Sequence, residues 1–207
     1  MIAHTGSLHR FLFPSFVWRM NSPDIFLTFD DGPHPTATPE VLKVLNTARI
    51  KGTFFLTGSN AVRYSSLVTE LGTEGHCVGV HAFNHSRALA FSRAATRNEI
   101  LRTEEVISSA GVNPVKIFRP PFGAFTWNTV SAARSLQYRI IMWTTLTGDF
   151  RPSWSDEKIT STALSKLSAG AILVFHDNES TKSRIAGVLT DTIARIKDHG
   201  FNFQAIE

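Results

Sequence analysis

The chain has 207 residues, of which 43% are hydrophobic and 18% are charged, and this length and composition support one domain with a substantial core. Its 16 Phe and four Trp exclude disorder over most of the chain, and its longest uninterrupted apolar run, residues 171–175, is far shorter than the ~20 residues of a membrane-spanning helix. The formal net charge is +4, but Lys and Arg are scattered singly, so the basic cluster that a nucleic-acid partner requires is absent.

The N-terminal segment lacks the pattern of a secretory signal. Arg10, Pro14 and Arg19 interrupt the first twenty residues, which leaves no apolar core of about 7–15 residues. Without an export signal, a cytoplasmic location is the default expectation. The one cysteine, Cys77, excludes an internal disulfide.

Apolar, β-rich runs alternate with helical patterns from residue 24 onward. Strands are predicted at residues 24–29, 53–56, 77–80, 115–118, 139–145, 171–175 and 201–206. Helices are predicted at residues 39–50, 60–71, 96–110, 126–136, 155–167 and 183–198. Strands separated by helices of this length predict an α/β fold with a parallel sheet, either open and doubly wound or closed.

Polar side chains follow most of the predicted strands. In parallel α/β folds the ligand site lies at the carboxyl ends of the strands, so these residues are the candidates for chemistry. The candidates are Asp30, Asp31, His81, His85, Arg119, Asp149, His176 and Asp177. Most of them are residue types that bind metals or transfer protons.

A metal site is indicated by three of these positions taken together. The four-residue spacing of His81 and His85 brings two imidazoles to one side of a helical turn, as in zinc-binding helices, although such a pair alone is more often not a ligand pair. Two histidines and an aspartate at neighbouring strand ends supply the three protein ligands of a catalytic zinc. Because successive side chains of a strand alternate, one of Asp30 and Asp31 binds the metal and the other has a different role.

Five segments of the chain resemble, in order, the five motifs of the polysaccharide deacetylase family (NodB-homology domain, carbohydrate esterase family 4). The segments are residues 28–33, 81–85, 119–123, 143–150 and 174–177. The resemblance implies a distorted (β/α) barrel of about seven parallel strands that hydrolyses the acetamide of a sugar with the help of a divalent metal. Residues 24–207 would form this catalytic domain, and residues 1–23 are expected to be an N-terminal extension that packs on the barrel.

The resemblance also assigns roles at the metal. It implies that Asp31, His81 and His85 hold the ion, most often zinc, and that Asp30 is the general base. Arg119 would keep Asp30 ionised and oriented.

The remaining roles concern the leaving group and the acetyl group. The resemblance implies that His176 protonates the departing amine and that the backbone N–H of Phe122 stabilises the oxyanion. Phe150 and Val174 occupy positions that resemble the apolar pocket for the acetyl methyl.

The chain departs from the family pattern around this site. Ala82 stands where a Ser or Thr usually supports the metal site through a hydrogen bond, so weaker metal binding is expected. Leu146 stands where an acid usually tunes the catalytic histidine, and Asp149 is the candidate to replace that acid, with a different pH optimum. Phe150 stands at a position where the family commonly has Trp, and Val174 stands where it commonly has Leu.

These features favour a carbohydrate N-deacetylase that acts on an acetylated sugar or glycan and has no nucleic-acid partner. An O-acetyl esterase and a hydrolase of small cyclic amides are alternatives that would use the same site. A non-catalytic glycan-binding protein is the alternative from another class, and the presence of both Asp30 and His176 argues against it.

Overall fold

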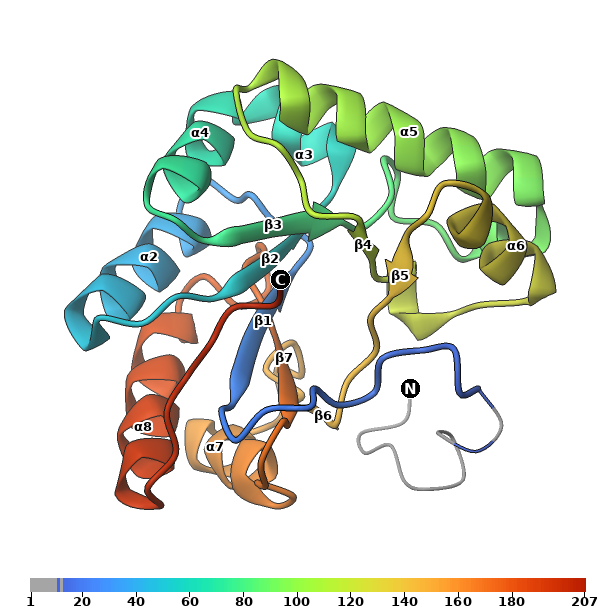
Figure 1. Cartoon of the computed structure of the whole chain (residues 1–207). Helices are drawn as coiled ribbons and strands as arrows, with labels where there is room; N and C mark the ends of the chain where they lie inside the picture. Colours follow the sequence, from blue (N-terminus) through green and yellow to red (C-terminus); the bar gives the residue numbers. More distant parts are fainter. Residues whose placement is uncertain (1–10, 12) are drawn as a thin grey trace.

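The computed structural model describes residues 11 and 13–207 and consists of one curled parallel sheet surrounded by helices (Figure 1). The strands are β1 (Phe26–Asp30), β2 (Thr53–Leu56), β3 (Cys77–Val80), β4 (Ile117–Phe118), β5 (Arg139–Ile140), β6 (Thr145–Leu146) and β7 (Ile172–His176). The α-helices are α2 (Ala37–Ala48), α3 (Gly58–Arg63), α4 (Ser65–Thr73), α5 (Arg93–Ser109), α6 (Trp127–Ser135), α7 (Asp156–Leu164) and α8 (Ile185–Asp198). Two 3₁₀ turns, η1 (Arg87–Phe91) and η2 (Pro121–Gly123), complete the described elements.

The seven strands are paired in the order β5-β4-β3-β2-β1-β7-β6, and every pairing is parallel. The predicted α/β fold with a distorted barrel of seven parallel strands is therefore confirmed. The barrel is incomplete, because β5 and β6 stand at opposite ends of the sheet although only four residues separate them in sequence.

The described part of the N-terminal segment lies along this gap. The N–H of Val17 donates to the carbonyl of Ile140 (2.9 Å), and the N–H of Met142 donates to the carbonyl of Val17 (2.8 Å). Farther along, the N–H of Met20 donates to the carbonyl of Gly170 (2.9 Å). Residues 1–10 and 12 of the predicted extension lie outside the described residues.

The central strands are buried on both faces, as their apolar sequences predict. Phe29 on β1 is in register with Phe54 on β2 and Phe175 on β7, and the three rings stack with centroids 4.8 and 6.2 Å from that of Phe29. Each ring contributes about 1.5–3 kcal/mol by its burial. Side chains alternate along β1, so Thr28 and Asp30 lie on the face opposite to Phe29.

Three predicted elements differ from the structure. The strand predicted at residues 139–145 is two strands, β5 and β6, because residues 141–144 cross between the two ends of the sheet and Ile141 pairs with Val17 instead. The helix predicted at residues 60–71 is interrupted at Tyr64, whose backbone leaves the helical region (φ −129°, ψ 49°). The strand predicted at residues 201–206 is wrong, since in that segment only Phe203 forms a bridge, with Ile25.

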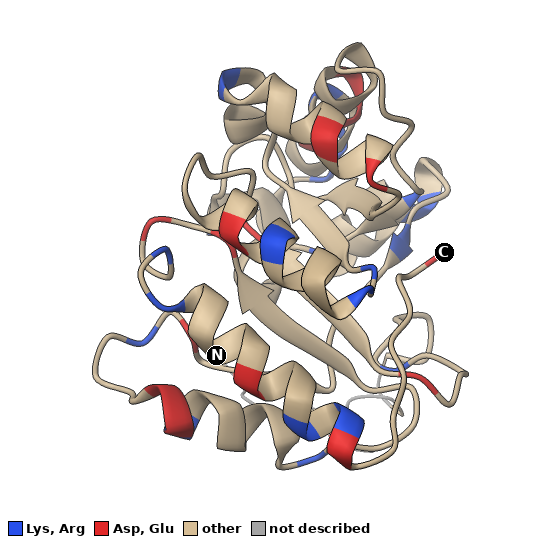
Figure 2. Cartoon of the chain, turned by 90° about the vertical axis from the view of Figure 1, so that its left-hand side faces the viewer, with Lys and Arg blue, Asp and Glu red and all other residues tan. Residues whose placement is uncertain are grey.

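The helices cover the outside of the sheet, with α2 packed on α8 and α8 on α7. On the face shown in Figure 2, basic and acidic residues are interspersed rather than gathered by sign. An example is the pair Arg195–Asp191 on α8, with an N–O distance of 3.0 Å. None of the described helices is both long and apolar enough to cross a bilayer.

The parallel arrangement brings the polar strand ends to one edge of the sheet. Asp30 at the end of β1 is in register with His176 at the end of β7, although 145 residues lie between them in the sequence. His81 and Arg119 come directly after β3 and β4, which are neighbours in the sheet. The fold therefore assembles the candidate residues of four different segments at a single site.

Candidate active site

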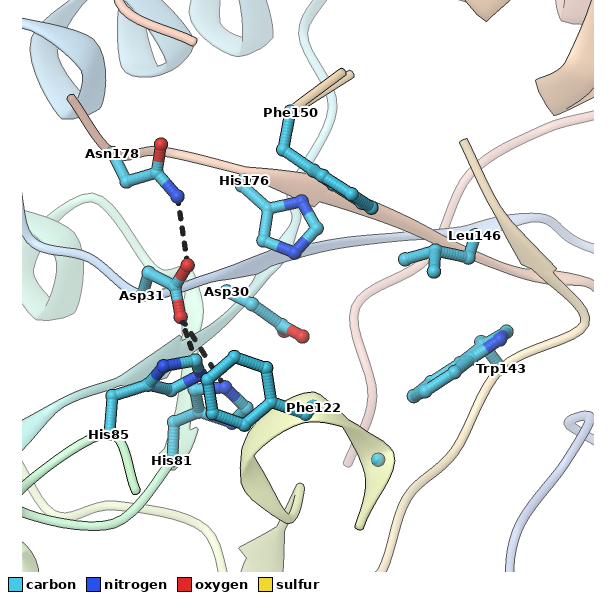
Figure 3. Close-up of a pocket in the computed structure, with 11 residues that line it drawn as sticks. Asp30, Asp31, His81, His85, Phe122, Trp143, Leu146, Phe150, His176 and Asn178 are labelled. Carbon is cyan, nitrogen blue, oxygen red and sulfur yellow. Dashed lines mark hydrogen bonds and ion pairs between the residues drawn. The ribbon is translucent and has the colours of Figure 1, made fainter. Parts of the chain in front are cut away.

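A pocket of about 280 Å³ opens at the carboxyl ends of the strands (Figure 3). Its lining residues are Asp30, Asp31, His81, His85, Phe122, Gly123, Trp143, Leu146, Phe150, His176 and Asn178. Charged and imidazole groups form one part of this lining, and the apolar side chains of Trp143, Leu146 and Phe150 form another.

Asp31, His81 and His85 converge in the pocket with ligand atoms that all lie within 4.8 Å of one another. Asp31 Oδ1 is 3.5 Å from His81 Nε2 and 3.2 Å from His85 Nε2. His81 Nδ1 lies 2.7 Å from the carbonyl oxygen of Arg119, and because a carbonyl only accepts, Nδ1 carries the proton. This contact turns Nε2 of the His81 ring toward the buried Asp31 oxygen.

This donor set fits a divalent cation. Asp31 Oδ1 is buried, has no hydrogen-bond partner among the described residues, and lies within 3.5 Å of Nε2 of both histidines. Two imidazole nitrogens and one carboxylate oxygen are ligands that zinc accepts, and three ligands leave positions for water and substrate. The Arg119 carbonyl orients the His81 ring in the way that outer hydrogen bonds orient metal-ligating histidines.

Neighbouring groups set the charge of these ligands. Burial raises the pKa of Asp31, but the His81 contact and the charge of His176 outweigh it, and the pKa lies well below the ordinary value. Burial lowers the pKa of His85, with His81 adding to the effect. Both residues are therefore in the deprotonated form that a metal requires at neutral pH.

The loop backbones, and not a helical turn, bring these ligands together. Residues 81–85 are not helical, so the predicted helical arrangement of His81 and His85 is wrong. Ala82 adopts a left-handed conformation (φ 71°) and its carbonyl accepts from the N–H of Gly58 (3.0 Å), which fixes the loop on α3. Asp31 is also left-handed (φ 77°), and this turn directs its side chain away from that of Asp30.

Asp30 forms a buried ion pair with Arg119. Asp30 Oδ1 accepts from Arg119 Nη1 at 2.7 Å. The guanidinium is fully buried, and it also donates to the carbonyls of Ile141 (3.2 Å) and Met142 (3.0 Å) and to Thr28 Oγ1 (2.7 Å). The ion pair with this fixed cation orients Asp30, whose carboxylate points into the pocket (Figure 3).

His176 is paired with Asp149. Asp149 Oδ1 lies 2.9 Å from His176 Nδ1, and Asp149 Oδ2 accepts from the His176 backbone N–H at 2.6 Å. Burial alone would lower the pKa of His176, but the Asp149 carboxylate outweighs it and raises the pKa to about 9. The ring of His176 therefore carries a proton at neutral pH.

The predicted substrate contacts divide into two groups. Phe122, left-handed at φ 60°, and Phe150 both line the pocket, and the Phe150 ring packs edge-on against His176 at a centroid distance of 5.0 Å. Val174 is fully buried in β7 and is not among the residues that line the pocket. The structure therefore brings the two phenylalanines to the site and leaves Val174 in the core.

Asp177, also a strand-end candidate, is not among the pocket-lining residues. Asp177 Oδ2 accepts from Thr38 Oγ1 at 2.5 Å, and the carboxyl lies against Gly32, where an added Cβ would come within 2.2 Å of it. Complete burial, with Asp31 and Asp30 adding to it, raises the pKa of Asp177 to about 8. Asp177 is therefore a buried residue that packs against Gly32, next to Asp31.

Sequence reasoning did not find Asn178, although this residue contacts a predicted ligand. Asn178 Nδ2 donates to Asp31 Oδ2 at 2.8 Å (Figure 3). Its position one residue after Asp177 at the end of β7 was the available signal. Trp143, which packs so closely on Gly123 that an added Cβ would lie 2.3 Å from its ring, was likewise not identified as a lining residue.

Comparison with known proteins agrees with this geometry. A family model described as polysaccharide deacetylase matches residues 19–141. A peptidoglycan-N-acetylglucosamine deacetylase of Bacillus cereus is 32% identical over 156 residues, which cover 75% of this chain and 56% of that protein. A chitooligosaccharide deacetylase of Bradyrhizobium is 30% identical over 171 residues, which cover 79% of this chain and 78% of that protein.

A solved structure shows the same fold. A peptidoglycan N-acetylglucosamine deacetylase in complex with 4-naphthalen-1-yl-N-oxidanyl-benzamide has a TM-score of 0.85 and 30% sequence identity, and the match covers 92% of this chain and 89% of that one. The chain spans between 38% and 56% of the length of the first relatives that it matches.

Proposed function

Because the chain belongs to the polysaccharide deacetylase family, we propose that it is a metal-dependent hydrolase that removes the acetyl group from N-acetylated sugars or glycans. The observation that carries this proposal is the register of Asp30 with His176 across β1 and β7. Asp30 and His176 therefore lie on adjacent strands and face the same pocket. The carboxylate of Asp30 can accept a proton, and the imidazolium of His176 can donate one. Amide hydrolysis requires both transfers.

Asp31, His81 and His85 would hold the divalent ion, and their donor atoms favour zinc. When bound, such an ion polarises the acetyl carbonyl and lowers the pKa of a water molecule. The outer contacts of the ligands, from the Arg119 carbonyl to His81 and from Asn178 to Asp31, fix the ligand atoms before the ion arrives.

The chain's own residues would then carry out the proton transfers. Asp30, paired with Arg119, accepts the proton of the attacking water. His176, charged because Asp149 supports its proton, donates from Nε2 to the amine nitrogen as the C–N bond breaks. The N–H of Phe122 would stabilise the oxyanion, and Trp143, Leu146 and Phe150 offer an apolar surface for the acetyl methyl.

The acid residue favours an amide over an ester as the substrate. An amine leaves as a very strong base unless it is protonated, whereas an alcohol leaves more easily, so the raised pKa of His176 matters most for an amide. A glycan-binding protein without activity would need neither the Arg119–Asp30 pair nor the Asp149–His176 pair.

Acetate release tests the proposal. Oligosaccharides of N-acetylglucosamine and O-acetylated xylan should be incubated with the protein at equal acetyl concentration, with added zinc and with a chelator. We expect acetate from the N-acetylated substrate, loss of release with the chelator, and recovery with zinc. Release from xylan alone would make the protein an esterase, and tight glycan binding without release from either substrate would contradict a hydrolase.

Replacing Asp149 should move the pH limit of activity. In Asp149→Asn, His176 loses the carboxylate that chiefly opposes the effect of burial, so its pKa falls from about 9, while Asp31 and Asp30 still raise it. Because the proton donor is active only below its pKa, the alkaline fall of kcat should begin about 1–3 pH units lower than in the unmodified protein, the usual effect of removing an adjacent opposite charge. The measurement is kcat against pH at saturating substrate and zinc.

Asp156→Asn is the matched control, because Asp156 lies at the start of α7 and pairs with Arg184 (2.9 Å) outside the pocket. Its pH profile should equal that of the unmodified protein. An unchanged alkaline limb in Asp149→Asn would contradict His176 as the proton donor.

A further inference from the structure

We propose that Asn178 is a positioning residue that holds Asp31 as a one-oxygen metal ligand. This proposal rests on the metal site of the proposed function. Asn178 Nδ2 donates to Asp31 Oδ2 (2.8 Å), while Oδ1 of the same carboxylate faces His81 and His85 (Figure 3). The two oxygens of Asp31 are thereby given different partners.

The orientation of the Asn178 amide is fixed by its own partners. The backbone N–H of Ser180 donates to Asn178 Oδ1 at 2.9 Å, and Ser180 Oγ donates to the same oxygen at 2.7 Å. A peptide N–H can only donate, so this atom of Asn178 is the oxygen and the other is the amide nitrogen. The nitrogen therefore points to Asp31, and its N–H is the donor in that contact.

The turn that carries Asn178 is itself anchored to β7. Thr181 Oγ1 donates to the carbonyl of His176 (2.6 Å), and the backbone N–H of Asn178 donates to Thr181 Oγ1 (3.3 Å). Asn178 is partly buried at the pocket wall. A donor held this firmly limits rotation of the Asp31 side chain, so little conformational entropy remains to be lost when an ion binds.

Ala82 explains why this donor matters in the present chain. The residue after His81 is buried and left-handed, and its methyl group offers no hydrogen bond to the metal ligands. Asn178 reaches the Asp31 ligand from the turn that follows β7. The backbone of Asp31 is held separately, since Asn60 Nδ2 donates to its carbonyl at 2.8 Å, so Asn178 is the described side chain that orients the carboxylate.

Zinc affinity measured by competition with a chromophoric chelator tests this role without relying on activity. Asn178→Ala should bind zinc roughly 10–100-fold more weakly, the usual effect of losing an outer partner of a metal ligand. With zinc in excess, kcat should recover to near the unmodified value and KM should not change. In the cobalt-substituted protein, the visible absorption bands should change, because the Asp31 carboxylate becomes free to use both oxygens.

A second variant separates the Asp31 contact from the integrity of the turn. Asn178→Ser keeps a side-chain oxygen that can accept from the Ser180 N–H but ends short of Asp31, so it should lose zinc affinity as Asn178→Ala does. Glu179→Gln is the matched control in the same turn, because Glu179 is exposed and pairs with Lys182 and His34 instead of the site. Its zinc affinity should not change.

Three results would overturn the proposal. Zinc affinity within about twofold of the unmodified protein in both Asn178 variants would remove the positioning role. A raised KM with unchanged zinc affinity would make Asn178 a substrate contact. A protein that binds no zinc would remove the metal site in which Asn178 is said to position Asp31.

A different result would contradict only the proposed hydrolase. If the Asn178 variants lose zinc affinity but the unmodified protein releases no acetate, the positioning role of Asn178 stands and the hydrolase is contradicted.

Discussion

Asp30→Asn should lower kcat by roughly 10²–10⁴, the usual contribution of a general base, while zinc remains bound. The amide keeps the size of the carboxylate and an oxygen that can accept from Arg119 Nη1, so the pocket retains its shape. It cannot take a proton from water, and the reaction loses its base. Acetate release at saturating zinc, together with metal content after dialysis, measures both effects.

Asp24→Asn is the matched control, because Asp24 precedes β1 at the opposite end of the strand and contacts Ser22 rather than the pocket. It should retain kcat. Loss of zinc in Asp30→Asn, with Asp31→Asn retaining it, would mean that the two aspartates have the opposite roles. An unchanged kcat in the zinc-loaded variant would remove Asp30 as the base.

His81→Ala should lose bound zinc and activity together, with kcat/KM lower by on the order of 10³ or more, since the metal supplies several kcal/mol of transition-state stabilisation. The substitution removes one of three ligand atoms and leaves the Arg119 carbonyl without its imidazole donor. Metal content by atomic absorption and acetate release should be measured on the same preparation.

His199→Ala is the control for His81→Ala, because His199 is exposed at the end of α8 and lies outside the pocket. It should keep both zinc and activity. His81 is buried, so thermal unfolding of the zinc-free proteins should be compared to show that the variant is folded. A folded His81→Ala protein with full zinc and full activity would contradict the ligand assignment.

The sequence indicates the central strands well and the edge strands poorly. The runs of β1, β2, β3 and β7 are long enough to identify because burial on both faces makes most of their residues apolar. β5 and β6 have two residues each, and the segment between them is apolar for a different reason, since Ile141 pairs with Val17 from the N-terminal segment. Local pattern carries no information about such a distant partner.

The candidate site, like the sheet, could be predicted only in part from the local sequence pattern. The positions of Asp30, His81 and His176 after apolar runs predicted a shared edge, because all strands are parallel. The pairings within the site depend on side-chain directions that no spacing reveals. Neither the contact of His81 Nδ1 with the Arg119 carbonyl nor the hydrogen bond from Asn178 to Asp31 could be inferred from the sequence.

Anomalous diffraction at the zinc absorption edge, from crystals grown with one equivalent of zinc, tests most directly whether the three side chains form a metal site. The geometry predicts one strong peak in the pocket, within about 2.0–2.2 Å of Asp31 Oδ1, His81 Nε2 and His85 Nε2, with His176 and Asp30 close by but not bound to the ion. A peak at other residues, or none in crystals whose protein contains zinc, would contradict the assignment of Asp31, His81 and His85 as the ligands.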